Sequence, residues 1–112
     1  MDTIKINYQA VIQQIFDQYI EFLGNSDNTR IEKVVDPENQ HYLLIETGWE
    51  NGYRIYGILI HIDIVDDKIW IQQDGTEEGI AGELVALGIP KNQIVLGFKP
   101  SDRRKLTEFA VN

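Results

Sequence analysis

The side chains best suited to chemistry in this sequence are a histidine and an aspartate, His61 and Asp63, near the start of the isoleucine-rich stretch 58–98. Residues i and i+2 of a β-strand point to the same face, so these two side chains should lie side by side, with Tyr42 of a neighbouring strand opposite the histidine. Such a group could act in general acid–base catalysis. A histidine on a half-exposed sheet face more often serves packing or an interface, and we favour that interpretation.

Acidic side chains near His61 offer a second kind of chemistry, because carboxylate oxygens bind hard divalent cations. A metal-dependent nuclease or hydrolase that uses Asp63, Asp66, Asp67 or His61 is therefore an alternative function. The run Asp66-Asp67-Lys68 also matches the D-x-K part of metal-dependent nuclease sites. That match is only three residues long and falls in a tight turn, so it is weak support.

Further motifs for catalysis or metal binding are missing from the sequence. It has no glycine-rich loop ending in GK[ST], no GxSxG and no HExxH, and its lack of cysteine excludes thiolate chemistry and disulfides. Asp74, Glu77 and Glu78 fit no EF-hand spacing, and the first two are placed to cap a helix. We therefore expect no catalytic residues, no metal site and no cofactor.

The charge of the chain bears on nucleic-acid binding. Eighteen acidic and ten basic residues give a formal net charge of −8, which repels a polyanion. Positive charge gathers only at Arg103, Arg104 and Lys105. Direct DNA binding through this cluster is an alternative function, although a solvated helical face is the simpler interpretation of such a run.

Length and hydropathy bound the class of protein. A chain of 112 residues has the usual size of one domain, and we expect a single domain over residues 1–112. No apolar run approaches the ~20 residues that cross a bilayer, and the N-terminus lacks a signal-peptide pattern. A cytoplasmic protein with no membrane contact is the resulting expectation.

Periodicity and turn residues predict the elements that would position these side chains. A helical apolar period runs from Ile4 to Leu23 and ends at Gly24, and a short strand at 31–35 precedes a turn at 36–39. Asn51-Gly52 predicts a two-residue hairpin turn, and Asp66-Asp67 a second tight turn. A helix capped by Asp74 and Glu77 should stop at Gly88, before a strand at 94–98 and a helical turn to Phe109. The order is typical of an α+β fold: a helix, a four-stranded mainly antiparallel meander, a helix, a short strand and a helical turn.

The two turns fix a register and hence the two faces of the sheet. One face pairs Trp49 with Arg54, Thr47 with Tyr56, Ile45 with Ile58, Leu43 with Ile60, His41 with Ile62, Ile62 with Ile71 and Ile64 with Ile69. The other pairs Glu46 with Gly57, Leu44 with Leu59, Tyr42 with His61, His61 with Gln72 and Asp63 with Trp70. Because the first face is almost wholly aliphatic, we expect it to form the core. The second face mixes aromatic and polar groups like an interface, although one of the chain's own helices could cover it. The interface residues we predict are Tyr42, Tyr53, Leu59, His61, Asp63, Trp70 and Gln72.

Several longer motifs carry a family resemblance. These are His61-Ile62-Asp63-Ile64, Lys68-Ile69-Trp70-Ile71-Gln72, Asp74-Gly75-Thr76-Glu77-Glu78-Gly79-Ile80-Ala81 and Leu84-Val85-Ala86-Leu87-Gly88-Ile89-Pro90, with support in Ile94-Val95-Leu96-Gly97-Phe98. From Tyr8 onward the chain resembles the XisI-like family, the fdxN element excision controlling factors of cyanobacteria.

That resemblance implies a role in programmed excision of the fdxN DNA element in heterocyst development. It implies a controlling factor that acts beside a separate recombinase and a companion protein, XisH, and it brings no catalytic residues with it. We therefore expect a non-catalytic, protein-binding accessory factor that pairs with an XisH-like protein, or with itself as a homo-oligomer.

Overall fold

The computed structural model describes residues 6–24 and 28–112, and its framework is one five-stranded sheet. The elements are α1 (Tyr8–Leu23), β1 (Thr29–Asp36), β2 (His41–Glu50), β3 (Tyr53–Val65), β4 (Lys68–Asp74), α2 (Ile80–Ala86), the 3-10 helix η1 (Lys91–Gln93), β5 (Ile94–Leu96) and α3 (Ser101–Arg104). Strands β1 to β4 form an antiparallel meander, and β5 joins β4 in the parallel direction. The predicted α+β class and the predicted order of elements are confirmed.

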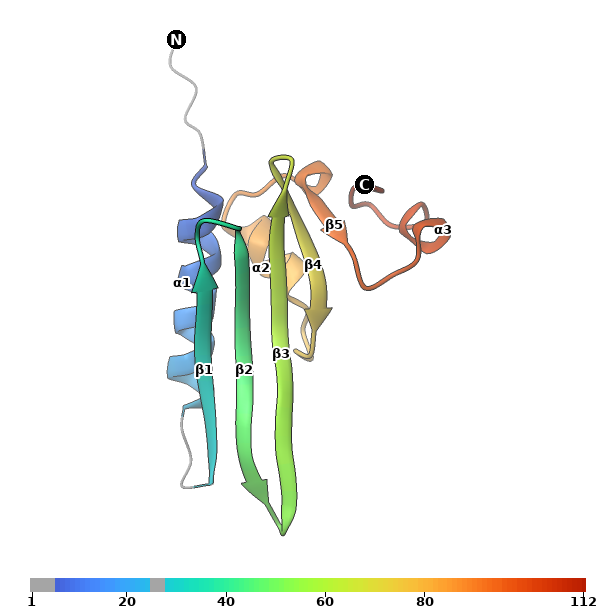
Figure 1. Cartoon of the computed structure of the whole chain (residues 1–112). Helices are drawn as coiled ribbons and strands as arrows, with labels where there is room; N and C mark the ends of the chain where they lie inside the picture. The colour runs from blue at the N-terminus through green and yellow to red at the C-terminus, as the bar shows by residue number, and fades with distance from the viewer. Residues whose placement is uncertain (1–5, 25–27) are drawn as a thin grey trace.

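Helices α1 and α2 cover one side of the sheet. Helices α1 and α2 lie behind the strands, and α3 lies beyond the β5 edge (Figure 1). Side chains of α1 and α2 form one hydrophobic core with the sheet residues that face them: Ile12, Ile15, Phe16, Tyr42, Leu44, Ile60, Ile62, Ile69, Ile71, Ile80, Leu84, Ile89, Ile94 and Leu96. We call the opposite side of β1 to β4 the open face.

Helix α1 begins later than its apolar period suggests. The Asn7 side chain accepts a hydrogen bond from the backbone N–H of Ala10 at 3.1 Å, so Asn7 is the N-cap and Tyr8 the first helical residue. The predicted start near Ile4 is therefore wrong, and Ile4 itself lies outside the described residues. The end at Gly24 is confirmed, with φ +64° and a hydrogen bond from its N–H to the Ile20 carbonyl. No helix in the described part of the chain is long and apolar enough to cross a membrane.

Both predicted hairpin turns are present. Asn51 and Gly52 have φ of +51° and +82°, and Asp66 and Asp67 have φ of +50° and +61°. Two consecutive positive φ values are the mark of the type I′ turn, whose twist matches that of the flanking strands. The pairs next to each turn are accordingly those predicted, from Trp49 with Arg54 to Ile45 with Ile58, and from Ile64 with Ile69 to Ile62 with Ile71.

Farther from the turn, a β-bulge changes the register of the β2–β3 hairpin. Ile45 pairs with Ile58, but Leu44 pairs with Ile60, which leaves Leu59 as an extra residue in β3. Beyond the bulge every side chain changes its partner, because one extra residue exchanges the two faces. The predicted pairs Leu43 with Ile60, His41 with Ile62, Leu44 with Leu59 and Tyr42 with His61 are therefore wrong.

The bulge has a physical reason in the packing of β2. Tyr42-Leu43-Leu44-Ile45 is apolar at every position, so the sequence does not show which side of β2 is buried. The bulge places Tyr42 and Leu44 beside Ile60 and Ile62, and all four are at most 1% exposed in the core. Leu43, Ile45 and Ile58, predicted as core, lie instead on the open face, where Ile58 is 43% exposed.

A second bulge displaces Gln72 in β4. His61 pairs with Gln73 and Ile62 with Ile71, so the predicted pair of His61 with Gln72 is also wrong. Ile62 keeps its predicted partner, Ile71, in the core.

The start of helix α2 is held by Asp74. One carboxylate oxygen accepts from the backbone N–H of Thr76 at 2.9 Å, and the other accepts from that of Ile80 at 2.8 Å. Asp74 therefore accepts from the first N–H of the helix, but the helix begins at Ile80 and its N-cap residue is Gly79, so the predicted N-cap at Asp74 and the capping box with Glu77 are wrong.

Candidate functional site

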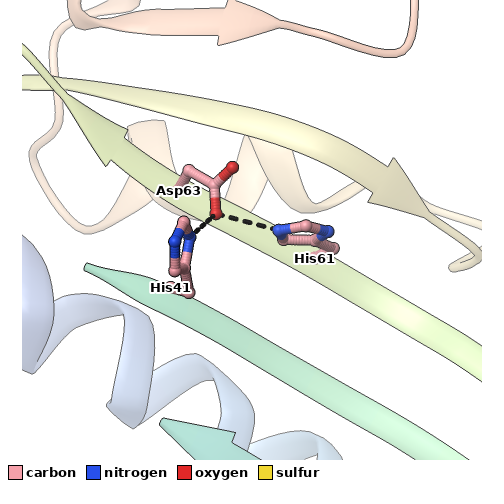
Figure 2. Close-up of side chains that lie close together, drawn as sticks. All are labelled: His41, His61 and Asp63. Carbon is pink, nitrogen blue, oxygen red and sulfur yellow. Dashed lines mark hydrogen bonds and ion pairs between the residues drawn. The ribbon is translucent and has the colours of Figure 1, made fainter. Parts of the chain in front are cut away.

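Two histidines and an aspartate meet on the open face. His41 comes from β2, and His61 and Asp63 come from β3 (Figure 2). Nδ1 of His41 lies 2.6 Å from Oδ1 of Asp63, and Nε2 of His61 lies 2.8 Å from the same oxygen. One carboxylate oxygen thus accepts hydrogen bonds from two imidazoles. We call His41, His61 and Asp63 the His–Asp–His cluster.

The second oxygen of Asp63 has its own partner. The side-chain amide of Gln72 donates to Oδ2 of Asp63 at 3.3 Å, which leaves Oδ1 turned to the two imidazoles. Exposure falls from His41 to His61 to Asp63, at 50%, 28% and 14% of each side chain. The carboxylate is therefore mostly enclosed, and solvent reaches the cluster beside His41.

The contacts within the cluster change its acid–base behaviour. The hydrogen bond to Asp63 is the largest effect on His41 and raises its pKa above 6.5, although partial desolvation opposes it. Burial alone would raise the pKa of Asp63, but the hydrogen bonds from His41 and His61 together outweigh burial and hold that pKa below 3.8. These shifts favour a positive His41 beside a negative Asp63.

The two histidines share a face only because of the β3 bulge. His61 and Asp63 are i and i+2 on β3 and share a face by simple alternation, as predicted. His41 is directly opposite Asp63 in the register that follows the bulge, whereas the regular register turns it to the core side. Sequence reasoning missed His41 for this reason. The available signal was weak: a second histidine on the neighbouring strand.

The predicted interface residues divide between the two sides of the sheet. His61, Asp63, Trp70 and Gln72 belong to the open face, as the hydrogen bonds around Asp63 and the pair of Asp63 with Trp70 require. The prediction of Tyr42 as an interface residue is wrong, because its side chain is 1% exposed and belongs to the core on the helix side.

The two remaining interface predictions lie away from the cluster. Leu59 packs against the core and lines a cleft with Tyr19 and Phe22 of α1, so it lies on the helix side of the sheet. Tyr53 is 76% exposed and begins β3 beside the hairpin turn.

Exposed apolar side chains surround the cluster on the open face. Val34 and Ile58 are each 43% exposed, and toward the hairpin turn Trp49 and Tyr56 are 55% and 74% exposed. The guanidinium of Arg54 lies 5.4 Å from the Trp49 ring centre and 5.8 Å from that of Tyr56, which confirms the predicted contact with Trp49. Helices α1 and α2 lie on the other side of the sheet (Figure 1). They cover Tyr42, Leu44 and Leu59, so for these three residues the alternative that the chain's own helices cover the predicted second face is correct.

The C-terminal basic residues differ in their contacts. The Arg104 guanidinium donates to the carbonyls of Leu96, Lys99 and Val111, and it lies 5.1 Å from the centre of the Trp70 ring. Arg104 therefore ties the C-terminal segment to the sheet. Arg103 and Lys105 are exposed.

The acids of the β3–β4 turn stand apart from the His–Asp–His cluster. In residues 6–24 and 28–112, the only group of three or more metal-binding side chains whose ligand atoms lie within 4.8 Å of one another is His41, His61 and Asp63. Of the residues named for the hydrolase alternative, His61 and Asp63 belong to this group, together with His41, whereas Asp66 and Asp67 lie outside it.

Comparison with known proteins identifies the family of this chain. No curated protein was found to be similar. Among solved structures, a XisI-like protein from Anabaena variabilis ATCC 29413 is 34% identical, with a TM-score of 0.87, over 94% of this chain and 96% of that one. The fdxN element excision controlling factor XisI from the same organism is 32% identical, with a TM-score of 0.81 and the same coverage. The family model for the XisI protein matches residues 1–111. The chain belongs to the XisI family.

Proposed function

We propose that this protein is a XisI-type controlling factor for excision of the fdxN DNA element, as the name of its 32% identical relative suggests. In this role it is a non-catalytic accessory factor in the cytoplasm. It binds an XisH-like protein during the programmed rearrangement that accompanies heterocyst development.

The open face is the observation that carries the protein-binding part of this proposal. It exposes Val34, Trp49, Tyr56 and Ile58 on a sheet whose other face already holds the core. Exposed apolar side chains gathered on one surface are typical of protein–protein contact. Interfaces are also enriched in tryptophan, tyrosine and arginine, and Trp49, Tyr56 and Arg54 lie together at one end of this face.

Charge makes the DNA-binding alternative less suitable. The net charge of −8 opposes phosphate contact, and the one basic cluster has Arg104 engaged with backbone carbonyls and Trp70. A partner that itself binds DNA removes this difficulty, because the acidic chain then touches protein only.

A binding experiment with paired variants tests the proposal. The purified chain is titrated into an XisH-like protein encoded in the same genome, and the affinity is measured by calorimetry. Tyr56→Ser should weaken binding by more than about 1 kcal/mol if Tyr56 is central to the interface. Trp70→Ala and His61→Ala test the part of the surface around the His–Asp–His cluster.

Phe22→Ser is the matched control. Phe22 is also an exposed aromatic residue, at 86% exposure, but it belongs to α1 on the far side of the sheet. If Phe22→Ser abolishes binding and Tyr56→Ser leaves it unchanged, the interface lies on the helix side instead. Absence of binding, together with a stable dimer in light scattering, would favour self-association instead. Duplex DNA retained by the chain alone at low salt would favour direct DNA binding.

A further inference from the structure

We propose that the His–Asp–His cluster is a binding site for one divalent transition-metal ion, best suited to Zn²⁺. Its ligands are Nδ1 of His41, Nε2 of His61 and Oδ1 of Asp63. The inference concerns the chain alone and does not depend on whether it binds an XisH-like partner.

The three ligand atoms already converge. Nδ1 of His41 and Nε2 of His61 lie 2.6 Å and 2.8 Å from Oδ1 of Asp63, and all three atoms lie within 4.8 Å of one another. In a tetrahedral site with Zn–N and Zn–O bonds of about 2.0–2.2 Å, neighbouring ligand atoms are about 3.3–3.6 Å apart. Each ligand must therefore move by less than about 1 Å, and the ion replaces the two protons that the imidazoles now share with Oδ1.

The chemistry of the donors selects the kind of ion. Two imidazole nitrogens with one carboxylate oxygen suit Zn²⁺ and its first-row neighbours, whereas Mg²⁺ and Ca²⁺ prefer sites made only of oxygen. Asp36 lies opposite His41 in the β1–β2 register, which adds a second carboxylate near the site. The surroundings are therefore negatively charged and favour a cation.

Contacts outside the three ligands hold them in position, as is usual in metal sites. All three belong to paired strands, and Gln72 donates to the free oxygen of Asp63, so the carboxylate is held with Oδ1 toward the histidines. Outer contacts of this kind orient the ligands of metal sites. With three protein ligands, the fourth position is left for water or a group from a partner, and the 50% exposed His41 gives the ion a way in.

Calorimetric titration of the untagged, chelator-treated chain with ZnCl₂ tests the site. We expect saturable binding of one ion per chain, a rise in melting temperature and no comparable binding of Mg²⁺. His41→Ala, His61→Ala and Asp63→Asn should each weaken binding about 100-fold or more. Gln72→Ala, which removes only the outer contact, should weaken it about 10-fold.

The matched control is the double substitution Asp66→Asn and Asp67→Asn, which removes acidic groups from the nearby turn but leaves the cluster intact. It should bind Zn²⁺ as the native chain does. The proposal is overturned if Zn²⁺ does not bind, or if the three ligand variants bind as tightly as the native chain. Loss of binding only in the turn variant would assign the ion to Asp66 and Asp67.

A measurement on the native chain avoids reliance on the folding of variants. Nitrogen-15 NMR of the imidazole rings distinguishes Nδ1 from Nε2 coordination. Addition of Zn²⁺ should shift Nδ1 of His41 and Nε2 of His61. Shifts at the other nitrogen of each ring, or at neither ring, would contradict the geometry.

Discussion

At the scale of single residues, Asp63 organises the open face. Its Oδ1 accepts from His41 and His61, and its Oδ2 accepts from Gln72, so a carboxylate that is only 14% exposed has partners on both oxygens. A buried carboxylate is costly unless it is paired in this way. Replacement of Asp63 should therefore disturb both histidines at once, whereas replacement of the more exposed His41 should leave the contact with His61 in place.

The pairing of Asp63 with His41 predicts a pH-dependent stability of the metal-free chain. The pKa of Asp63 is lowered, so its contribution is present above about pH 3.8 and is lost as the pH falls through the lowered value. The pKa of His41 is raised, so its contribution is present below about pH 6.5 and is lost as the pH rises through the raised value. The difference in unfolding free energy between the native chain and Asp63→Asn should thus be larger at pH 5 than at pH 8.

Urea unfolding at both pH values, in the presence of a chelator, measures this difference. Proton NMR of the His41 ring provides the control, because its pKa should fall toward 6.5 in Asp63→Asn. An equal difference in stability at pH 5 and pH 8 would show that charge pairing contributes little.

At the scale of elements, the pairing of β1 with β2 depends on a close approach at Gly48. Gly48 has φ +152°, and a Cβ atom at this position would lie 2.1 Å from the backbone oxygen of Asn28. That same oxygen accepts from the N–H of Trp49 at 2.9 Å. Only glycine lets the start of β1 pair this tightly with β2.

Gly48→Ala should therefore destabilise the chain by about 1–3 kcal/mol, through backbone strain and displacement of β1. Gly57→Ala is the matched control, because a Cβ atom there has nothing within 4 Å. Its effect should stay within about 0.5 kcal/mol. Thermal unfolding of both variants measures their losses of stability. Equal losses would show that the close contact at Gly48 is not the cause.

At the scale of the whole molecule, the two sides of the sheet have different roles. The helix side holds the core in which Tyr42, Leu44, Ile60 and Ile62 are buried. The open side keeps apolar side chains such as Ile58 in contact with solvent, together with the His–Asp–His cluster. This asymmetry comes from the bulge at Leu59, and it leaves a surface that adds little to the core.

Two substitutions on either side of this bulge test which face is the core. Ile60→Ala should lower the unfolding free energy by about 2–5 kcal/mol, because it leaves a cavity in a fully buried site. Ile58→Ala should cost about 1 kcal/mol or less, because that side chain is 43% exposed. Urea denaturation measures both, and a larger loss for Ile58→Ala would reverse the two faces.

Local signals in the sequence determined much of the fold. The apolar period to Leu23, the Asn51-Gly52 turn, the Asp66-Asp67 turn and the stop at Gly88 each act over a few residues, so they can be recognised without a partner in space. They were sufficient for the α+β class, the element order and the register near both turns. The shared face of His61 and Asp63 followed from the same local rule of alternation.

The tertiary structure alone decided which side of β2 is buried. Apolar residues occupy successive positions from Tyr42 to Ile45, so the hydrophobic pattern is satisfied whichever alternate set of side chains is buried. Only packing against α1 and α2 selects Tyr42 and Leu44, and β3 accommodates that choice by bulging at Leu59. The bulge brings His41 to Asp63 and so completes the His–Asp–His cluster. Its position depends on contacts between residues distant in the chain, which no local pattern encodes.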